Sequence, residues 1–166
     1  SIAMMFTALS SAYIVRAASS NDWYPLAMPR ILFASTAIIL LSSGSFEVAK
    51  RKLRASRVSG YAGWLLITGL LGLAFLGSQL IAWRHLRAQG IYLATNPHSS
   101  FFYLLSAAHA LHLFGGLIAL LYLLLRARKL LLNGAVDNRR KAAADAVGIY
   151  WHFMDGLWIY LFLLLF

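Results

Sequence analysis

The chain has 166 residues, of which 61% are hydrophobic and 12% are charged, and its mean hydropathy is +0.71. Soluble domains are about half apolar and about a quarter charged, so this composition excludes an ordinary soluble domain. The lack of cysteine excludes disulfides and thiolate metal sites. The net charge of +10 lies in short basic clusters between apolar runs, which indicates contact with lipid headgroups rather than with nucleic acid.

The apolar runs predict five membrane-spanning helices, because about 20 apolar residues cross the hydrocarbon core. In chain order they cover about residues 1–15, 31–48, 63–83, 101–125 and 147–166. The first run is short and lacks the basic start and cleavage site of a signal peptide, so we interpret it as the end of a helix that begins upstream. We therefore expect an all-α integral membrane protein in which residues 1–166 form a single five-helix domain.

The basic residues predict how the bundle is oriented. The connections after the second and fourth spans carry Lys50, Arg51, Lys52, Arg54, Arg57, Arg126, Arg128, Lys129, Arg139, Arg140 and Lys141. The connections after the first and third spans carry Arg16, Arg30, Arg84 and Arg87. Because loops rich in Lys and Arg stay inside, the amino terminus should lie inside and the carboxyl terminus outside. Arg30, Arg84 and Arg87 are then candidates for contacts with lipid headgroups at the outer surface.

Ionisable side chains occur within two of the spans, and such groups are rare in membranes and usually face the bundle interior. The fourth span holds His109 and His112, and the fifth holds His152 and Asp155, so that each pair shares one helical face. With a rise of about 1.5 Å per residue, His112 lies roughly 16 Å from one surface and Asp155 roughly 12 Å from the other. Because the hydrocarbon core is about 30 Å thick, the two polar faces lie at similar depth and can meet. We therefore predict that a histidine of the fourth span approaches His152 or Asp155 within hydrogen-bond range, directly or through water.

Three interpretations of this polar layer compete. Haem ligation would need one histidine from each of the last two spans, and a di-iron site lacks its other carboxylates. A proton path remains open because histidine and buried aspartate act as relay groups, although a full path needs groups at successive depths. We favour the third interpretation, in which the four side chains hydrogen-bond across the two helices and fix their register. Glu47 is interpreted as a charge that extends to the inner surface.

The same segments resemble a known family. The stretches SSFFYLLSAAHALHLFGGLIAL (99–120) and YWHFMDGLWIYLF (150–162) are similar to subunit III of haem-copper respiratory oxidases, the cytochrome c oxidase and quinol oxidase group. Besides the histidines and the aspartate, the positions that carry the likeness are Gln79, Trp83, Ser99, Ser100, Trp151 and Trp158. The first family helix usually has a glutamate where this chain has Ile2, so no role of that acid is transferred.

The resemblance implies the five-helix form of this subunit, with no haem or copper of its own and no catalysis by this chain alone. In the family, subunit III packs on the haem-bearing subunit I, binds lipid and supports the stability and proton uptake of the complex. Expected partners are subunits I and II, a small subunit IV and membrane lipids, in a bacterial cytoplasmic membrane. The alternative is a membrane cytochrome or a proton-relay subunit that uses the four polar residues. The electron donor, cytochrome c or quinol, and the distinction from a nitric oxide reductase accessory subunit are left open.

Overall fold

A computed structural model describes residues 1–19, 30–92, 97–133 and 138–165, without the side chains of residues 130–133. The helices are α1 (Ile2–Ser19), α2 (Ile31–Arg54), α3 (Val58–Ala88), α4 (Pro97–Asn133) and α5 (Asn138–Leu165). Each is long and apolar enough to cross a membrane. Over these described ranges the predicted all-α architecture is confirmed, with five helices long and apolar enough to span a membrane.

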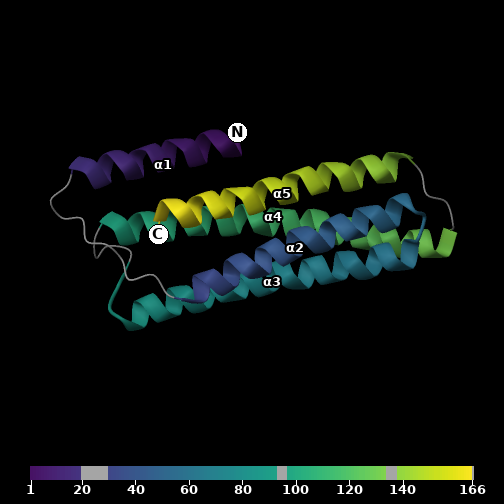
Figure 1. The fold of residues 1–166 in the computed structure, drawn as a ribbon, viewed down its shortest axis with the longest axis horizontal. Helices are drawn as coiled ribbons and strands as arrows, with labels where there is room; N and C mark the ends of the chain where they lie inside the picture. The colour runs from purple at the N-terminus through teal and green to yellow at the C-terminus, as the bar shows by residue number, and fades with distance from the viewer. Residues whose placement is uncertain (20–29, 93–96, 134–137, 166) are drawn as a thin grey trace.

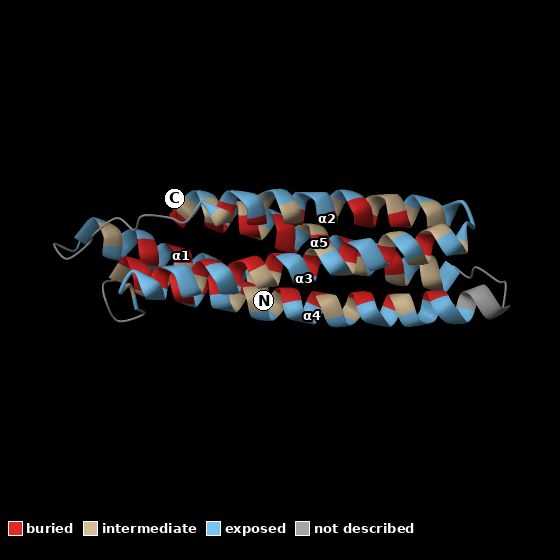
Figure 2. Ribbon diagram, turned by 90° about the horizontal axis from the view of Figure 1, so that it is seen from below, coloured by how far each residue is buried: buried red, intermediate tan, exposed pale blue. Residues whose placement is uncertain are grey.

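The helices run alternately in opposite directions along the long axis of the molecule (Figure 1). α2 packs on α3 and α5, and α4 packs on the same two helices, so these four helices form a closed ring. α1 packs on α4, beside the half of the bundle that holds the carboxyl terminus (Figure 1). Buried residues form stripes along the helices, with exposed residues on the opposite faces (Figure 2).

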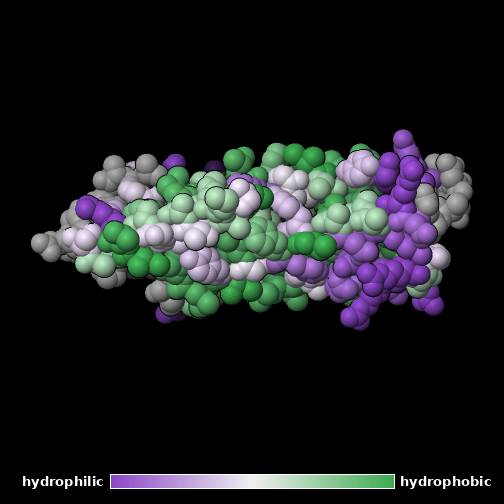
Figure 3. Space-filling view, turned by 90° about the horizontal axis from the view of Figure 1, so that it is seen from above, coloured by the Kyte–Doolittle hydropathy of each residue, from purple (hydrophilic) through white to green (hydrophobic). Residues whose placement is uncertain are grey.

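The helices at one end of the bundle extend beyond the apolar runs. α4 continues past residue 125 and α5 begins well before residue 147, and both extensions carry basic side chains. Hydrophilic side chains gather at the end where α2 meets α3, whereas hydrophobic side chains cover much of the middle of the same face (Figure 3). An apolar belt next to a charged end suits a bundle that crosses the membrane and meets headgroups at that end.

A short turn joins α2 to α3. The Arg57 N–H donates to the Lys52 carbonyl at 2.9 Å, and the Ser56 N–H donates to the Leu53 carbonyl at 3.0 Å. These bonds satisfy the last carbonyls of α2. Ser56 has a φ of 56°, the left-handed conformation that glycine adopts more easily. The turn places α2 and α3 side by side and so positions the α2 residues that meet α5.

Candidate functional site

The buried face of α5 meets the other three helices of the ring. Trp151, Asp155 and Trp158 lie on this face at spacings of four and three residues, and they are 0%, 3% and 2% exposed. The two indoles contact residues of α2, α3 and α4. The segment that suggested chemistry in the sequence is therefore the place where the last helix is fixed to the rest of the ring.

Trp151 lies against two glycines. A Cβ atom at Gly72 of α3 would stand 3.0 Å from the indole Cη2, and one at Gly116 of α4 would stand 3.3 Å from Cζ3. The indole N–H donates to Ser42 Oγ of α2 at 3.2 Å, and the ring stacks beside Phe46. Small residues on α3 and α4 thus provide the space, and a hydroxyl on α2 orients the ring.

Trp158 forms a second aromatic layer. Its indole N–H donates to Thr36 Oγ1 of α2 at 3.1 Å. Its ring centroid lies 4.9 Å from that of Phe75 on α3 and 5.2 Å from that of His109 on α4. Because Phe75 and His109 also meet edge to face, one layer of rings connects three helices and a hydroxyl adds the fourth.

His109 and Asp155 are buried without a hydrogen-bond partner among the described residues. His109 is 1% exposed, and its ring contacts are aromatic. Asp155 has Ser43 as a close polar neighbour, but neither carboxylate oxygen is hydrogen-bonded within the described chain. The predicted direct hydrogen bond from either group to the partner helix is thus not formed among these residues. The bridge through water that the sequence also allows stays a prediction.

A different hydrogen bond joins α4 to α5. The Tyr150 O–H donates to the backbone carbonyl of His112 at 2.7 Å. The His112 ring donates from Nδ1 to the Ala108 carbonyl at 2.7 Å and packs edge-on against Phe6 of α1. Tyr150 was not among the residues of the polar layer predicted from the sequence, which were the ionisable side chains of the two helices. The signal in the sequence was its place beside Trp151 in the aromatic motif, and the structure places its ring against Gly116 of α4.

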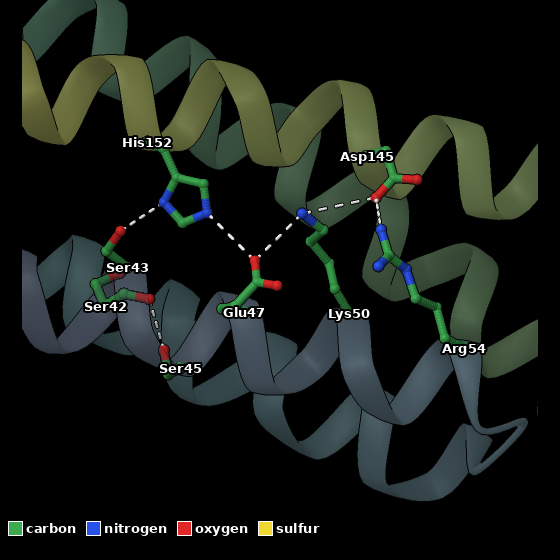
Figure 4. A network of polar contacts seen from close by, with 8 residues as sticks. All are labelled: Ser42, Ser43, Ser45, Glu47, Lys50, Arg54, Asp145 and His152. Atoms are coloured by element: carbon green, nitrogen blue, oxygen red, sulfur yellow. Dashed lines mark hydrogen bonds and ion pairs between the residues drawn. The ribbon is translucent and has the colours of Figure 1, made fainter.

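His152 points to α2 rather than to α4 and belongs to a line of polar contacts (Figure 4). Its Nδ1 is hydrogen-bonded with Ser43 Oγ, and its Nε2 lies 3.6 Å from Glu47 Oε2. The Ser43 hydroxyl donates when the ring proton is on Nε2, the nitrogen that faces the carboxylate. The His152 and Glu47 side chains are 39% and 38% exposed, so this contact lies at the outer edge of the α2–α5 interface.

The line continues to the charged end of the bundle (Figure 4). Lys50 Nζ lies 3.2 Å from Glu47 Oε2 and 3.6 Å from Asp145 Oδ1, and Arg54 Nη2 lies 3.1 Å from the same Asp145 oxygen. Glu47 therefore does more than extend to the surface, because it contacts Lys50 of its own helix and His152 of α5. The signal in the sequence was the spacing of polar residues along one face of each helix, at positions 43, 47, 50 and 54 of α2 and 145 and 152 of α5.

Three further motif positions lie near the opposite end. Gln79 is 2% exposed, and neither atom of its amide has a hydrogen-bond partner in the described part of the chain. The Trp83 indole N–H donates to Ser106 Oγ at 3.2 Å, which joins α3 to α4. The Ser99 hydroxyl donates to the Tyr92 carbonyl at 2.9 Å, which ties the start of α4 to the residues after α3.

The predicted headgroup contacts lie at this same end of the bundle. Arg30 precedes α2, and Arg84 and Arg87 occupy the last turns of α3, and all three are exposed. Ser100 is half-buried in the first turn of α4. The structure thus gathers these residues at the end opposite the α2–α3 turn and away from the α5 interface.

The described side chains do not form an arrangement expected of a metal or haem site. No three His, Asp or Glu side chains among them come together as metal ligands would. A haem between α4 and α5 would need one histidine from each helix facing the same space. His152 faces α2, and His109 is enclosed by Phe75 and Trp158. The bis-histidine arrangement left open by the sequence therefore does not fit the residues in place.

Comparison with known proteins points to one family of oxidase subunits. The family described as "Cytochrome c oxidase subunit III" matches residues 2–166. The chain is 33% identical to the probable cytochrome c oxidase subunit 3 of Nocardia farcinica, covering 96% of this chain and 78% of that protein. It is 32% identical to cytochrome c oxidase subunit 3 of Synechocystis sp., covering 98% and 69%. It is also 27% identical to the cytochrome bo(3) ubiquinol oxidase subunit 3 of Pseudomonas putida, covering 96% and 76%.

Proposed function

The chain belongs to the cytochrome c oxidase subunit III family, and we propose that it acts as a non-catalytic subunit of a haem-copper terminal oxidase. In this role it packs on the haem-bearing subunit I, binds lipid and supports the stability and proton uptake of the complex. The observation that carries the proposal is that the motif residues are engaged in packing between helices of this chain. Trp151, Trp158, His109 and His152 all make contacts that hold helices of this chain together.

The proposal includes the surroundings of the chain. Residues 1–166 form one membrane domain in a bacterial cytoplasmic membrane, with the amino terminus inside and the carboxyl terminus outside. The basic cluster at the α2–α3 end supports this orientation, because Lys and Arg favour the inner side. Haem and copper belong to subunits I and II, and a small subunit IV is a further partner. Both cytochrome c oxidase and ubiquinol oxidase occur among the named relatives, so the donor is left to the other subunits.

Assembly tests this function. An affinity tag on the carboxyl end of the chain should co-purify the haem-bearing subunits from bacterial membranes in mild detergent. Removal of the chain should leave the haem and copper content of the remaining complex unchanged but should shorten its working life during turnover. Failure of the tagged chain to bring down any haem-containing subunit would refute the proposal.

A proton relay is the second candidate, and the line of polar contacts in Figure 4 favours it. The line runs from Asp145 at the charged end through Lys50 and Glu47 to His152, and the buried Asp155 lies one turn further along α5. These groups occupy successive depths, which is what a relay requires. The described relay stops at Asp155, so it would serve proton storage or uptake from one side.

Two matched variants separate the candidates. Glu47→Gln and Asp155→Asn keep the shape of the side chain and remove the acid. Under the structural role, oxidase that assembles with either variant turns over at the wild-type rate, and the loss lies in the amount of complex. A relay predicts the reverse, with normal assembly, slower turnover and slower proton uptake. Arg54→Gln serves as the control, because it removes an ion pair with Asp145 but leaves every group of the line from Asp145 to Asp155 in place.

A further inference from the structure

A small cavity lies inside the ring at the charged end of the bundle. All four helices of the ring contribute to its lining. The polar members are Tyr61 of α3, Arg126 of α4 and Arg140 of α5, and the others are leucine and alanine. Its volume is about 10 Å³, which is room for one occupant of the size of a water molecule. The cavity thus brings two cations and a phenol around a space for a single small occupant.

Arg140 carries a buried nitrogen that the described chain does not satisfy. Its Nη1 atom is enclosed and has no hydrogen-bond partner among the described residues, although the residue as a whole is half-buried. A guanidinium stays protonated, so Nη1 remains a donor. A buried charged donor without an acceptor costs free energy, and such an atom is usually explained by a water molecule or an ion. Since Arg140 lines the cavity, an acceptor placed there is within its reach.

The second cation of the cavity is Arg126. The side chain is largely exposed, but its guanidinium lies 4.8 Å from the centre of the Tyr122 ring, one turn earlier on α4. This contact over an aromatic face holds the charge beside the helix. Two guanidinium groups near one small space repel each other, and an anion between them is attracted to both. The arrangement therefore favours a negatively charged occupant over a neutral one.

The carboxylates near this end of the described chain are engaged elsewhere. Glu47 and Asp145 form their ion pairs with Lys50, Arg54 and His152, at the interface of α2 and α5. No carboxylate among the described residues lies within ion-pair distance of either arginine of the cavity. The cavity therefore carries positive charge that the described residues do not balance.

The size of the cavity selects among anions. A tetrahedral phosphate group is several times larger than a water molecule and does not fit. A carboxylate from a partner subunit would have to enter between helices that surround the space. A chloride ion is only slightly larger than a water molecule, and the flexible arginine side chains can adjust to it. Guanidinium and phenol donors beside apolar walls suit such an ion in both charge and size.

We propose that this cavity binds one small monovalent anion, represented by chloride, between Arg126 and Arg140 and within reach of the Tyr61 hydroxyl. The bound anion connects α3, α4 and α5 at the charged end of the ring and offsets the repulsion between the two cations. The site lies within this chain, so the inference does not rest on the proposed function.

Thermal unfolding of the complex in mild detergent tests the proposal, with the chain kept together with the subunits that accompany it. Chloride replaces gluconate at constant ionic strength, so that screening stays the same and only the size of the anion changes. Because a ligand of the folded state stabilises with the logarithm of its concentration, a tenfold rise in chloride should raise the unfolding temperature of this chain by about 2–4 °C. In crystals of the complex, bromide should give an anomalous scattering peak between Arg126 and Arg140.

Matched variants locate the effect. Arg126→Gln and Arg140→Gln each remove one cation of the cavity, and both should lose most of the chloride dependence. Arg128→Gln and Arg139→Gln are the controls, because these exposed arginines lie on the same two helices and do not line the cavity. The controls should keep the chloride dependence of the wild type.

Three results would overturn the proposal. A wild-type unfolding temperature that is independent of chloride would assign the cavity to a water molecule. Chloride dependence that is equal in the wild type and in both cavity variants would place the anion elsewhere. Asp137, outside the described residues, is the nearest carboxylate to Arg140 in the sequence. Chloride dependence that appears only in Asp137→Asn would show that this carboxylate is the natural occupant.

Discussion

The α2–α5 interface and the outer face of α3 and α4 use opposite chemistry within the same bundle. At the first, both buried indoles donate to hydroxyls of α2, and Glu47 and Lys50 contact side chains of α5. At the second, apolar side chains line an open groove, and many of them are about half exposed. One region satisfies polar groups between helices of the same chain, and the other presents hydrocarbon to its surroundings.

The difference shows what determines helix pairing in a membrane, where the hydrophobic effect contributes little to contacts between helices. In a bilayer an apolar helix face is as well solvated by lipid as by another helix, so close packing and hydrogen bonds decide the pairing. The α2–α5 region contains both, and the α3–α4 outer face contains neither on its exposed side. We therefore expect changes at the first to alter stability and assembly, and changes at the second to alter what the chain binds.

The largest effect is expected from Trp151→Ala. This change removes a fully buried indole, opens a cavity beside Gly72 and Gly116, and leaves Ser42 without its donor. In soluble proteins such a change costs about 3–5 kcal/mol. Thermal unfolding of the complex in detergent should show an early loss of this chain. Tyr160→Ala, which truncates an exposed aromatic residue of the same helix, should have little effect, and equal losses for the two would contradict the comparison.

A smaller loss is expected from Gly72→Ala. The added methyl group would stand 3.0 Å from both Trp151 and Leu117, so rings and helices must shift. Overpacking of this kind costs about 1–3 kcal/mol. Gly77→Ala is the matched control on α3, because no atom lies within 4 Å of its added Cβ and alanine favours helix by up to about 1 kcal/mol. The same unfolding assay should rank Gly77→Ala at or above the wild type, and the reverse ranking would argue against close packing at Trp151.

A double-mutant cycle measures the contribution of a single hydrogen bond between α2 and α5. Ser43→Ala and His152→Ala should be coupled, because these side chains bond to each other. Interhelical hydrogen bonds in membranes average about 0.6 kcal/mol and reach about 1.7 kcal/mol. Ser42→Ala combined with His152→Ala should be additive, because Ser42 accepts from Trp151 instead. Coupling of equal size in both cycles would show that the contact is not specific.

The smallest effect is expected on the outer face of α3. Leu66→Ala removes a side chain that is 49% exposed at the edge of the groove, and exposed substitutions usually change stability by at most about 0.5 kcal/mol. The neighbouring Leu65 is fully buried, and Leu65→Ala should cost about 2–5 kcal/mol. Equilibrium unfolding of the two variants measures the contrast. Similar losses at the two positions would mean that another part of the complex covers Leu66.

The sequence was sufficient to predict the five helices, because the length of an apolar run shows directly whether it can cross the hydrocarbon core. It was less informative about their ends. α5 begins at Asn138 rather than near residue 147, because its basic first turns remain helical although they are too polar for the apolar belt. Hydropathy measures where a helix enters hydrocarbon, whereas hydrogen bonding decides where the helix begins.

The direction of the polar side chains was harder to predict. Residues 152 and 155 are three apart, which leaves them about 60° apart around the helix. That angle is enough for Asp155 to enter the core while His152 reaches the edge facing α2. The sequence predicted the shared face but not which helix lies beside it, because the order of helices in the ring depends on contacts between distant segments. The same lack of neighbour information concealed the contact of Glu47 with His152.

We propose that the histidines of this chain support an oxidase without binding its cofactors. The most direct test of this proposal is the visible absorption spectrum of the tagged chain, first within the purified complex and then after separation from the other subunits in detergent. We expect haem bands in the complex and none in the separated chain, with subunits I and II identified in the complex by mass spectrometry. Haem bands that stay with the separated chain and disappear in His109→Ala or His152→Ala would contradict the account.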